Sequence, residues 1–157
     1  VTTALPSSLF KNLLTLEVVA IEAFNNLQTI PSDLFESVPG LHSVKIRQCP
    51  LLTAIPGDLF DGLEGQINTL DLSNSDLQSL PREMFEGNKM EFLRTLRLND
   101  NPSLTLPAGI FNATSTGISG TGNIYVGGTQ YANQICPNVR SHTGAPNNMR
   151  IRDCIEV

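Results

Sequence analysis

The side chains most often used in catalysis are few in this 157-residue chain, and their spacing assembles no catalytic group. The only histidines are His42 and His142, and neither stands in a nucleophile or metal-ligand pattern. The acidic pair Asp58 and Asp61 falls in a segment expected to be an exposed turn. The glycines of residues 117–122 precede no amphipathic helix, so they make a weak phosphate loop. We therefore expect no enzyme activity, no cofactor and no metal site.

The overall charge narrows the class of partner. The chain has 15 acidic and 10 basic residues and a formal net charge of -5. This balance argues against a protein that coats nucleic acid. No run of 18 apolar residues occurs, so direct insertion into a membrane is not expected. The chain begins at Val1, within the second half of a repeat, and we expect it to be a processed or truncated piece of a longer chain.

A motif of the form Leu/Ile-Pro-x-x-hydrophobic-Phe recurs along the chain. The fold that it builds must position any functional side chains. The prolines of the motif are Pro6, Pro31, Pro56, Pro81 and Pro107, so successive copies are 25, 25, 25 and 26 residues apart. A fixed period of this length is typical of a solenoid of stacked repeats. The motif's phenylalanines are expected to stack as a buried column; they are Phe10, Phe35, Phe60, Phe85 and Phe111.

Between these motifs lies a second pattern, Leu-x-x-Leu-x-Leu, whose alternation predicts a short strand with one buried face. Its fourth position falls at residues 19, 44, 70, 96, 124 and 149. The residue five places later marks an inward turn of the backbone, where a small polar side chain can satisfy buried amides. These turn residues are Phe24, Cys49, Ser75, Asn101, Thr129 and Cys154.

The combined pattern L-x-x-L-x-L-x-x-(N/C/S)-x-L-x-x-L-P-x-x-L-F resembles leucine-rich repeat proteins, specifically the typical repeats of secreted and receptor ectodomains. The resemblance implies an α/β solenoid: a horseshoe with a parallel concave β-sheet and short helical or irregular convex turns. It implies one domain over residues 1–157, in which 1–15 are a partial repeat, 16–120 are four regular repeats, and 121–157 are a divergent repeat and C-terminal cap. An extracellular or cell-surface location follows from the same likeness.

Two covalent features fit that location. A disulfide between Cys136 and Cys154 would hold the irregular cap, whereas the third cysteine, Cys49, is expected to be a small buried residue. Asn112-Ala113-Thr114 is an N-glycosylation sequon in a predicted loop, which makes Asn112 the expected glycan site.

In a leucine-rich solenoid, residues between the buried leucines line the concave sheet. Six of the ten basic residues fall there, while the acids lie mostly in the convex turns. The predicted ligand-binding residues are Lys45, Arg47, Asp71, Arg94, Arg97, Tyr125, Arg150 and Arg152. A basic stripe of this kind can attract an anionic protein or glycan despite the negative net charge.

Several interpretations stay open at this point. The charges can serve only to keep an exposed sheet in solution, and Asp71 can neutralise Lys45 or Arg97 across neighbouring strands. Tyr125 can fold over the cap instead of contacting a ligand. A structural alternative is a subunit of an extracellular assembly such as an adhesin, cell-wall or filament protein, with self-assembly through the repeat edges. An intracellular scaffold is the third hypothesis, and it predicts three free thiols.

Overall fold

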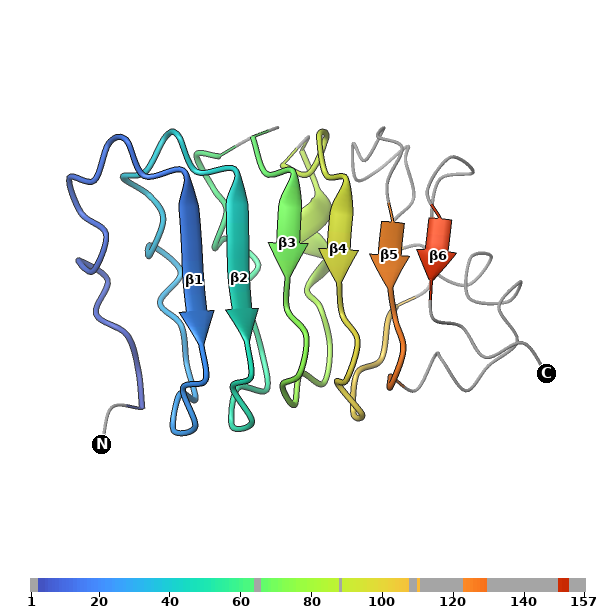
Figure 1. The fold of residues 1–157 in the computed structure, drawn as a ribbon. Coiled ribbons are helices and arrows are strands. Elements are labelled where there is room, and N and C mark those ends of the chain that lie inside the picture. Colours follow the sequence, from blue (N-terminus) through green and yellow to red (C-terminus); the bar gives the residue numbers. More distant parts are fainter. Residues whose placement is uncertain are drawn as a thin grey trace.

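The computed structural model describes residues 3–63, 66–87, 89–107, 110, 123–129 and 150–152. It is a parallel β-solenoid in which stacked coils each contribute one strand to a single sheet (Figure 1). The sheet order β1-β2-β3-β4-β5-β6 follows the chain. The strands are β1 Val18–Glu22, β2 Ser43–Arg47, β3 Thr69–Asp71, β4 Thr95–Arg97, β5 Asn123–Tyr125 and β6 Arg150–Arg152.

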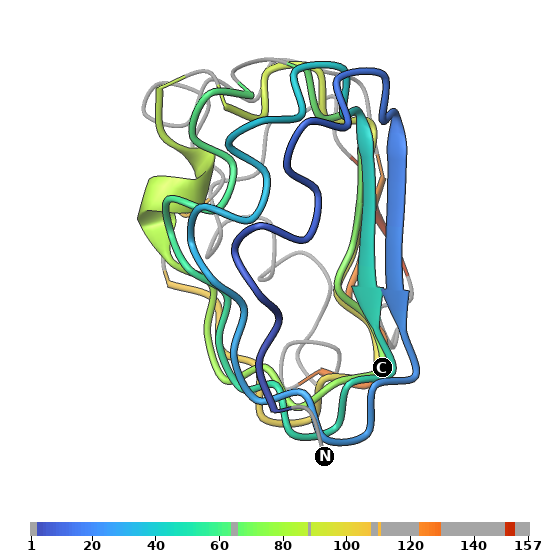
Figure 2. The same cartoon turned by 90° about the vertical axis from the view of Figure 1, so that its left-hand side faces the viewer.

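The strands stack in register, as the repeat period predicts. Val19, Val44, Leu70, Leu96 and Ile124 are successive partners across the sheet, and all five are buried. Because side chains alternate along a strand, the residues on either side of these point away from the core. Figure 2 looks along the stack from β1 and shows the sheet on one side, the turns on the other and the core between them.

The predicted phenylalanine column is confirmed for Phe10, Phe35 and Phe60. Phe35 stacks on Phe10 and on Phe60, with ring centroids 5.8 and 6.0 Å apart and both interplanar angles 21°. Phe35, Phe60 and Phe85 are fully buried, whereas Phe10 in the first coil is only partly covered. Phe111 lies outside the described residues. The motif therefore contributes to the core: Phe35 packs between the rings of the two neighbouring coils, and Phe60 and Phe85 are buried with it.

The helical content expected from an α/β horseshoe is not found in the part of the chain that the structure describes. Its one helix is the 3-10 segment η1, Arg82–Phe85. The other turns repeat a single contact, in which the N–H of the residue three places after the proline donates to the proline carbonyl. This bond recurs after Pro6, Pro31, Pro56, Pro81 and Pro107. A bond between residues three places apart is the bond of a 3-10 turn, which occurs in short pieces.

The inward-turn positions are confirmed for four of the six residues predicted. Cys49, Ser75, Asn101 and Thr129 are all buried. The Asn101 amide nitrogen donates to the carbonyls of Leu72 and Leu98 at 2.8 and 2.9 Å, and its oxygen accepts from the Leu77 N–H at 3.1 Å. Ser75 accepts from the Cys49 N–H at 3.2 Å. These side chains join adjacent coils where backbone groups have no strand partner.

Phe24 departs from that pattern, because its side chain is 43% exposed. An aromatic ring has no amide or hydroxyl group, so the Phe24 side chain cannot make the contacts that Asn101 and Ser75 make. Cys154 lies outside the described residues.

The predicted alignment of the last strand is wrong by two residues. The expected partner of Ile124 was Met149, but Ile124 pairs with Ile151, Asn123 with Arg150 and Tyr125 with Arg152. A slip of two residues keeps every side chain on the same face of a strand. Alternation alone therefore cannot choose between these two registers.

Within the described residues, no helix has the length and apolar character to cross a membrane.

Candidate functional site

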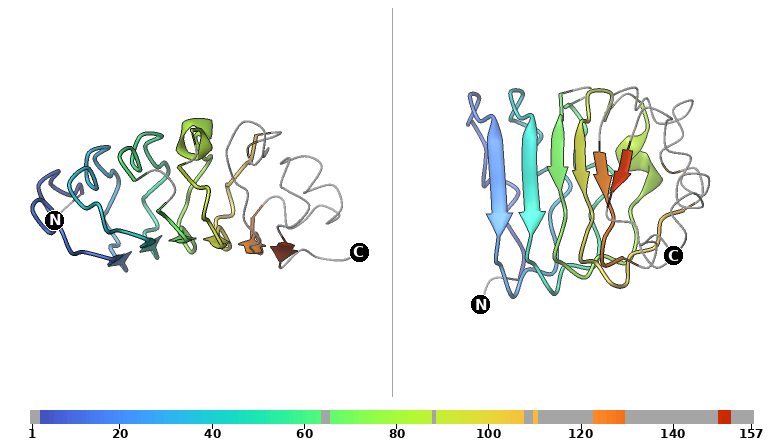
Figure 3. Two further views of the ribbon diagram at one scale, coloured as in Figure 1. Left: turned by 90° about the horizontal axis from the view of Figure 1, so that it is seen from above. Right: turned by 45° about the vertical axis from the view of Figure 1, so that its right-hand side comes forward.

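The candidate site is a depression on the outer sheet face, which we define as the solvent side of the sheet, opposite the core. Its volume is about 490 Å³, and it spans the middle strands β2, β3 and β4. Figure 3 shows this face along the lower edge of the stack in the view from above. Nine residues line the depression: Lys45, Arg47, Thr69, Asp71, Ser73, Asn74, Thr95, Arg97 and Asn99.

Strand register explains why these residues meet. Lys45 pairs with Asp71, and Asp71 pairs with Arg97, so the three form one row across neighbouring strands. Neighbouring strands lie about 4.8 Å apart, which places the Lys45 and Arg97 backbones about 10 Å apart. The row carries a carboxylate between two cations.

The hydrogen-bond partner of Asp71 is Ser73, and not the cations Lys45 and Arg97 that the sequence suggested. The Asp71 side chain is only 4% exposed, and its Oδ1 accepts from the Ser73 N–H at 3.1 Å and from the Ser73 hydroxyl at 2.6 Å. The suggested ion pairs with Lys45 or Arg97 do not form. The donors two residues away belong to the same chain segment, so they reach the carboxylate without ordering a long side chain.

Lys45 and Arg97 consequently keep their charge available. Neither forms an ion pair with any described carboxylate. The Arg97 guanidinium lies over the Tyr125 ring, with its central carbon 4.6 Å from the ring centroid. This cation–π contact restrains the guanidinium while leaving its N–H groups free for an anion. Tyr125 thus supports Arg97 from the neighbouring strand.

Arg47 is the least available of the lining cations. Its Nε donates to Glu22 Oε1 at 3.0 Å on the neighbouring strand β1. This hydrogen bond lowers the pKa of the Glu22 carboxyl and raises the pKa of Arg47. Asp71 adds a smaller upward contribution to the Arg47 pKa.

Arg94, another predicted ligand-binding residue, is not among the residues that line the depression. Arg94 is exposed just before β4, and its backbone N–H and carbonyl bond to Asn68 and Asn123 in a separate row. Arg150 and Arg152 occupy register positions beside Asn123 and Tyr125. Five hydroxyl- and amide-bearing lining residues were not among the predicted ligand-binding residues: Thr69, Ser73, Asn74, Thr95 and Asn99. Strand alternation places four of them on the outer face, and that signal was present in the sequence.

Asn74 reaches the depression through a backbone feature that the sequence analysis missed. It has a φ of 55° and is followed by the inward-turn residue Ser75. Residues just before the other inward turns share this left-handed conformation: Ala23, Gln48, Asp100 and Gly128. Only glycine adopts it without cost, and Asn is the next most tolerant residue. The recurring left-handed residue turns the chain out of the sheet at the same height in each coil.

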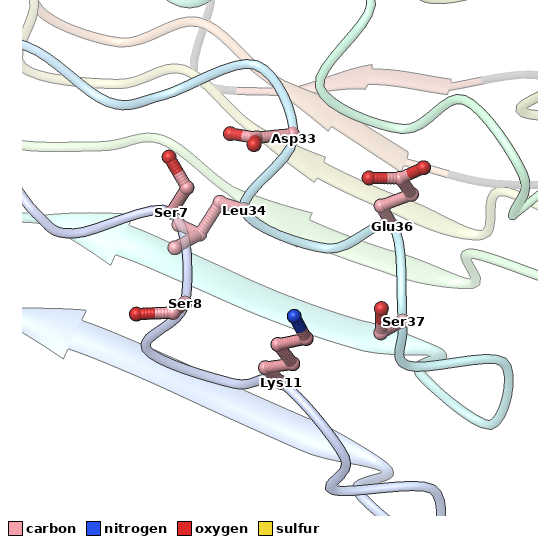
Figure 4. Close-up of a pocket in the computed structure, with 7 residues that line it drawn as sticks. All are labelled: Ser7, Ser8, Lys11, Asp33, Leu34, Glu36 and Ser37. Atoms are coloured by element: carbon pink, nitrogen blue, oxygen red, sulfur yellow. The ribbon is translucent and has the colours of Figure 1, made fainter.

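A second, smaller hollow lies between the turns after Pro6 and Pro31 (Figure 4). Its volume is about 150 Å³, and it holds one cation, Lys11, with the carboxylates Asp33 and Glu36 and three serine hydroxyls. No ion pair joins Lys11 to either acid. Its charges are of mixed sign on flexible exposed side chains, so it offers weaker recognition than the outer sheet face.

The cysteines offer no chemistry in the described part of the structure. Cys49 is a free, fully buried thiol, and burial raises the pKa of its thiol. A raised pKa keeps the thiol protonated and poorly nucleophilic at neutral pH. Cys136, Cys154 and the sequon residue Asn112 lie outside the described residues, so the bridge and the glycan stay predictions. Within those same bounds, no group of three or more metal-binding side chains occurs.

Neither a scan against models of protein families nor a search of curated protein sequences finds a match to this chain.

Proposed function

We propose that this chain is a leucine-rich repeat module that recognises an anionic ligand, a protein or an acidic glycan, through its outer sheet face and carries out no chemistry. The observation that carries the proposal is the pair Lys45 and Arg97, two cations beside one depression that have no ion-pair partner among the described residues. A cation left unpaired keeps its attraction for an external anion. The repeat signature supports the family assignment, and an extracellular setting is part of the same proposal.

The proposal predicts that Arg97→Glu weakens binding of anionic probes by about 10- to 100-fold, since a hydrogen bond to a charged group contributes about 1.5–3 kcal/mol. The probes are dextran sulfate, oligogalacturonate and poly-L-glutamate, each titrated against immobilised protein at low and high salt. Lys11→Glu is the matched control, because it makes the same charge change on an exposed side chain of the turn side. If the two variants weakened binding equally, the binding would be non-specific charge attraction, and the proposal would fail.

A second candidate function is assembly of this chain with itself, favoured by the surface of the first coil. Five of the seven exposed large apolar side chains among the described residues lie in residues 9–24; they are Leu9, Leu13, Leu14, Val18 and Phe24. Beside them, no described strand pairs with the outer edge of β1. The Glu17 carbonyl and the Ala23 N–H bond toward β2, so alternation directs the backbone groups of Val18, Ala20 and Glu22 outward.

That edge is complementary to itself. In an antiparallel pair of two β1 strands centred on Ala20, Val18 faces Glu22 of the second copy, and all the outward backbone groups find partners. Glu22 is already balanced by Arg47, so no unpaired like charges face each other. This candidate predicts a dimer by light scattering at tens of micromolar, which Val18→Lys converts to monomer and the control Leu51→Lys does not. A monomeric wild-type chain at that concentration would rule it out.

A further inference from the structure

The depression on the outer sheet face holds a feature that a simple anion site does not need. Asp71 stands between Lys45 and Arg97 in the same cross-strand row. A carboxylate at this position repels an incoming anion and so weakens binding of a ligand that offers only negative charge. An anionic ligand that also carries a hydroxyl donor can offset this repulsion by donating to the carboxylate.

One oxygen of Asp71 is available for such a group. Both hydrogen bonds that the carboxylate accepts, from the Ser73 N–H and hydroxyl, go to Oδ1. Oδ2 therefore has no partner within the described structure, where no fully buried side-chain nitrogen or oxygen is left unpaired. Oδ2 must then touch solvent, and Asp71 lines the depression. It is an oriented acceptor whose position is fixed by the bonds to Oδ1.

The surroundings of Asp71 favour a ligand rich in hydroxyl groups. The depression is bordered by the hydroxyls of Thr69, Ser73 and Thr95 and by the amides of Asn74 and Asn99. The Thr69 hydroxyl donates to Asn68, and the Asn99 amide donates to Asp100, so the side-chain oxygens of Thr69 and Asn99 keep lone pairs that can accept from a ligand. Such groups match a polyhydroxylated ligand better than an acidic peptide, which has few donors beyond its backbone.

We propose that the depression selects a carboxylated glycan, with the ligand carboxylate on Arg97 and Lys45 and a sugar hydroxyl donating to Asp71 Oδ2. The inference rests on the proposed function, since it names the ligand class of the same site. An acid with hydroxyl donors gains a charge-assisted hydrogen bond at Asp71, while an acid without them meets only repulsion. Asp71 is thus the residue that determines specificity, and Arg97 supplies affinity.

The test compares oligogalacturonate with poly-L-glutamate of matched length and charge. Wild-type protein should bind oligogalacturonate at least about tenfold more tightly, the factor expected for one added charge-assisted hydrogen bond. Asp71→Asn keeps an oxygen for Ser73 but removes the charge, and it should reduce that ratio about tenfold. Relief of repulsion affects both probes, so it cancels in the ratio. Arg97→Gln is the matched control and should weaken both probes while leaving the ratio unchanged.

A third probe, used with wild-type protein, tests the proposal even if Asp71→Asn fails to fold. Oligogalacturonate with acetylated hydroxyls keeps its carboxylates but has lost its donors, and wild-type protein should bind it as weakly as poly-L-glutamate. Equal binding of all three probes, or a ratio unchanged by Asp71→Asn, overturns the glycan assignment and leaves the anion-binding function standing. Binding of none of them by wild-type protein overturns both.

Discussion

Phe60→Ala is expected to destabilise the solenoid by about 3–5 kcal/mol, the range found when a buried aromatic ring is truncated. Phe60 is completely buried and stacks on Phe35, with centroids 6.0 Å apart. Removing the ring leaves a cavity in the middle of the stack, and Phe35 in the preceding coil loses its stacking partner. Because coils contact mainly their neighbours, a gap at this level also weakens the coupling between the two ends.

Urea unfolding followed by circular dichroism measures this effect. Phe92→Ala is the matched control, since the side chain of Phe92 is 56% exposed and its truncation should cost less than about 1 kcal/mol. A reduced slope of unfolding free energy against urea in Phe60→Ala would show that the stack has separated into two cooperative parts. Equal midpoints for the two variants would contradict the packed column.

Asn101→Ala is expected to cost about 2–4 kcal/mol, because a buried group that loses its partner costs about 1–3 kcal/mol and this amide serves several. Its nitrogen bonds the carbonyls of Leu72 and Leu98, and its oxygen bonds the Leu77 N–H. Alanine leaves these three backbone groups buried and unpaired. Two of the lost bonds connect neighbouring coils, since Leu72 and Leu77 belong to the coil before Asn101.

The control variants for Asn101 separate hydrogen bonding from general sensitivity. Asn101→Ser should be milder than alanine, because Ser75 fills the equivalent place in the preceding coil and bonds the Cys49 N–H. Asn26→Ala changes the same residue type at an exposed position and should alter the urea midpoint little. An Asn101→Ala protein with wild-type stability would show that water replaces the amide.

The sequence predicts well those parts of the fold that depend on period. Repetition every 25 or 26 residues located the strands, and alternation assigned Val19, Val44 and Leu70 to the buried side. The inward-turn residues followed from a bonding requirement that any stacked coil shares, so Cys49, Ser75 and Asn101 were recognised without a structure. Lys45 and Arg97 were placed on the outer face by the same alternation.

Features that depend on competition between neighbours were not predictable in this way. Asp71 had two cations across the sheet and Ser73 within its own segment, and proximity along the chain decided in favour of Ser73. The last strand had two registers that satisfied the alternation equally, and only the backbone pairing of Ile124 with Ile151 distinguished them.

The in-register stacking of one strand per coil also bears on how such a chain changes over generations. Duplicating or deleting one segment of about 25 residues would lengthen or shorten the outer sheet face by one strand spacing, about 4.8 Å. The core would accept the change, since each coil presents its neighbours with the same apolar interior. Each duplicated coil would bring its own outward-facing side chains with it. Recombination within the gene can therefore change the length of the outer sheet face by whole coils. No single-residue substitution is needed for that change.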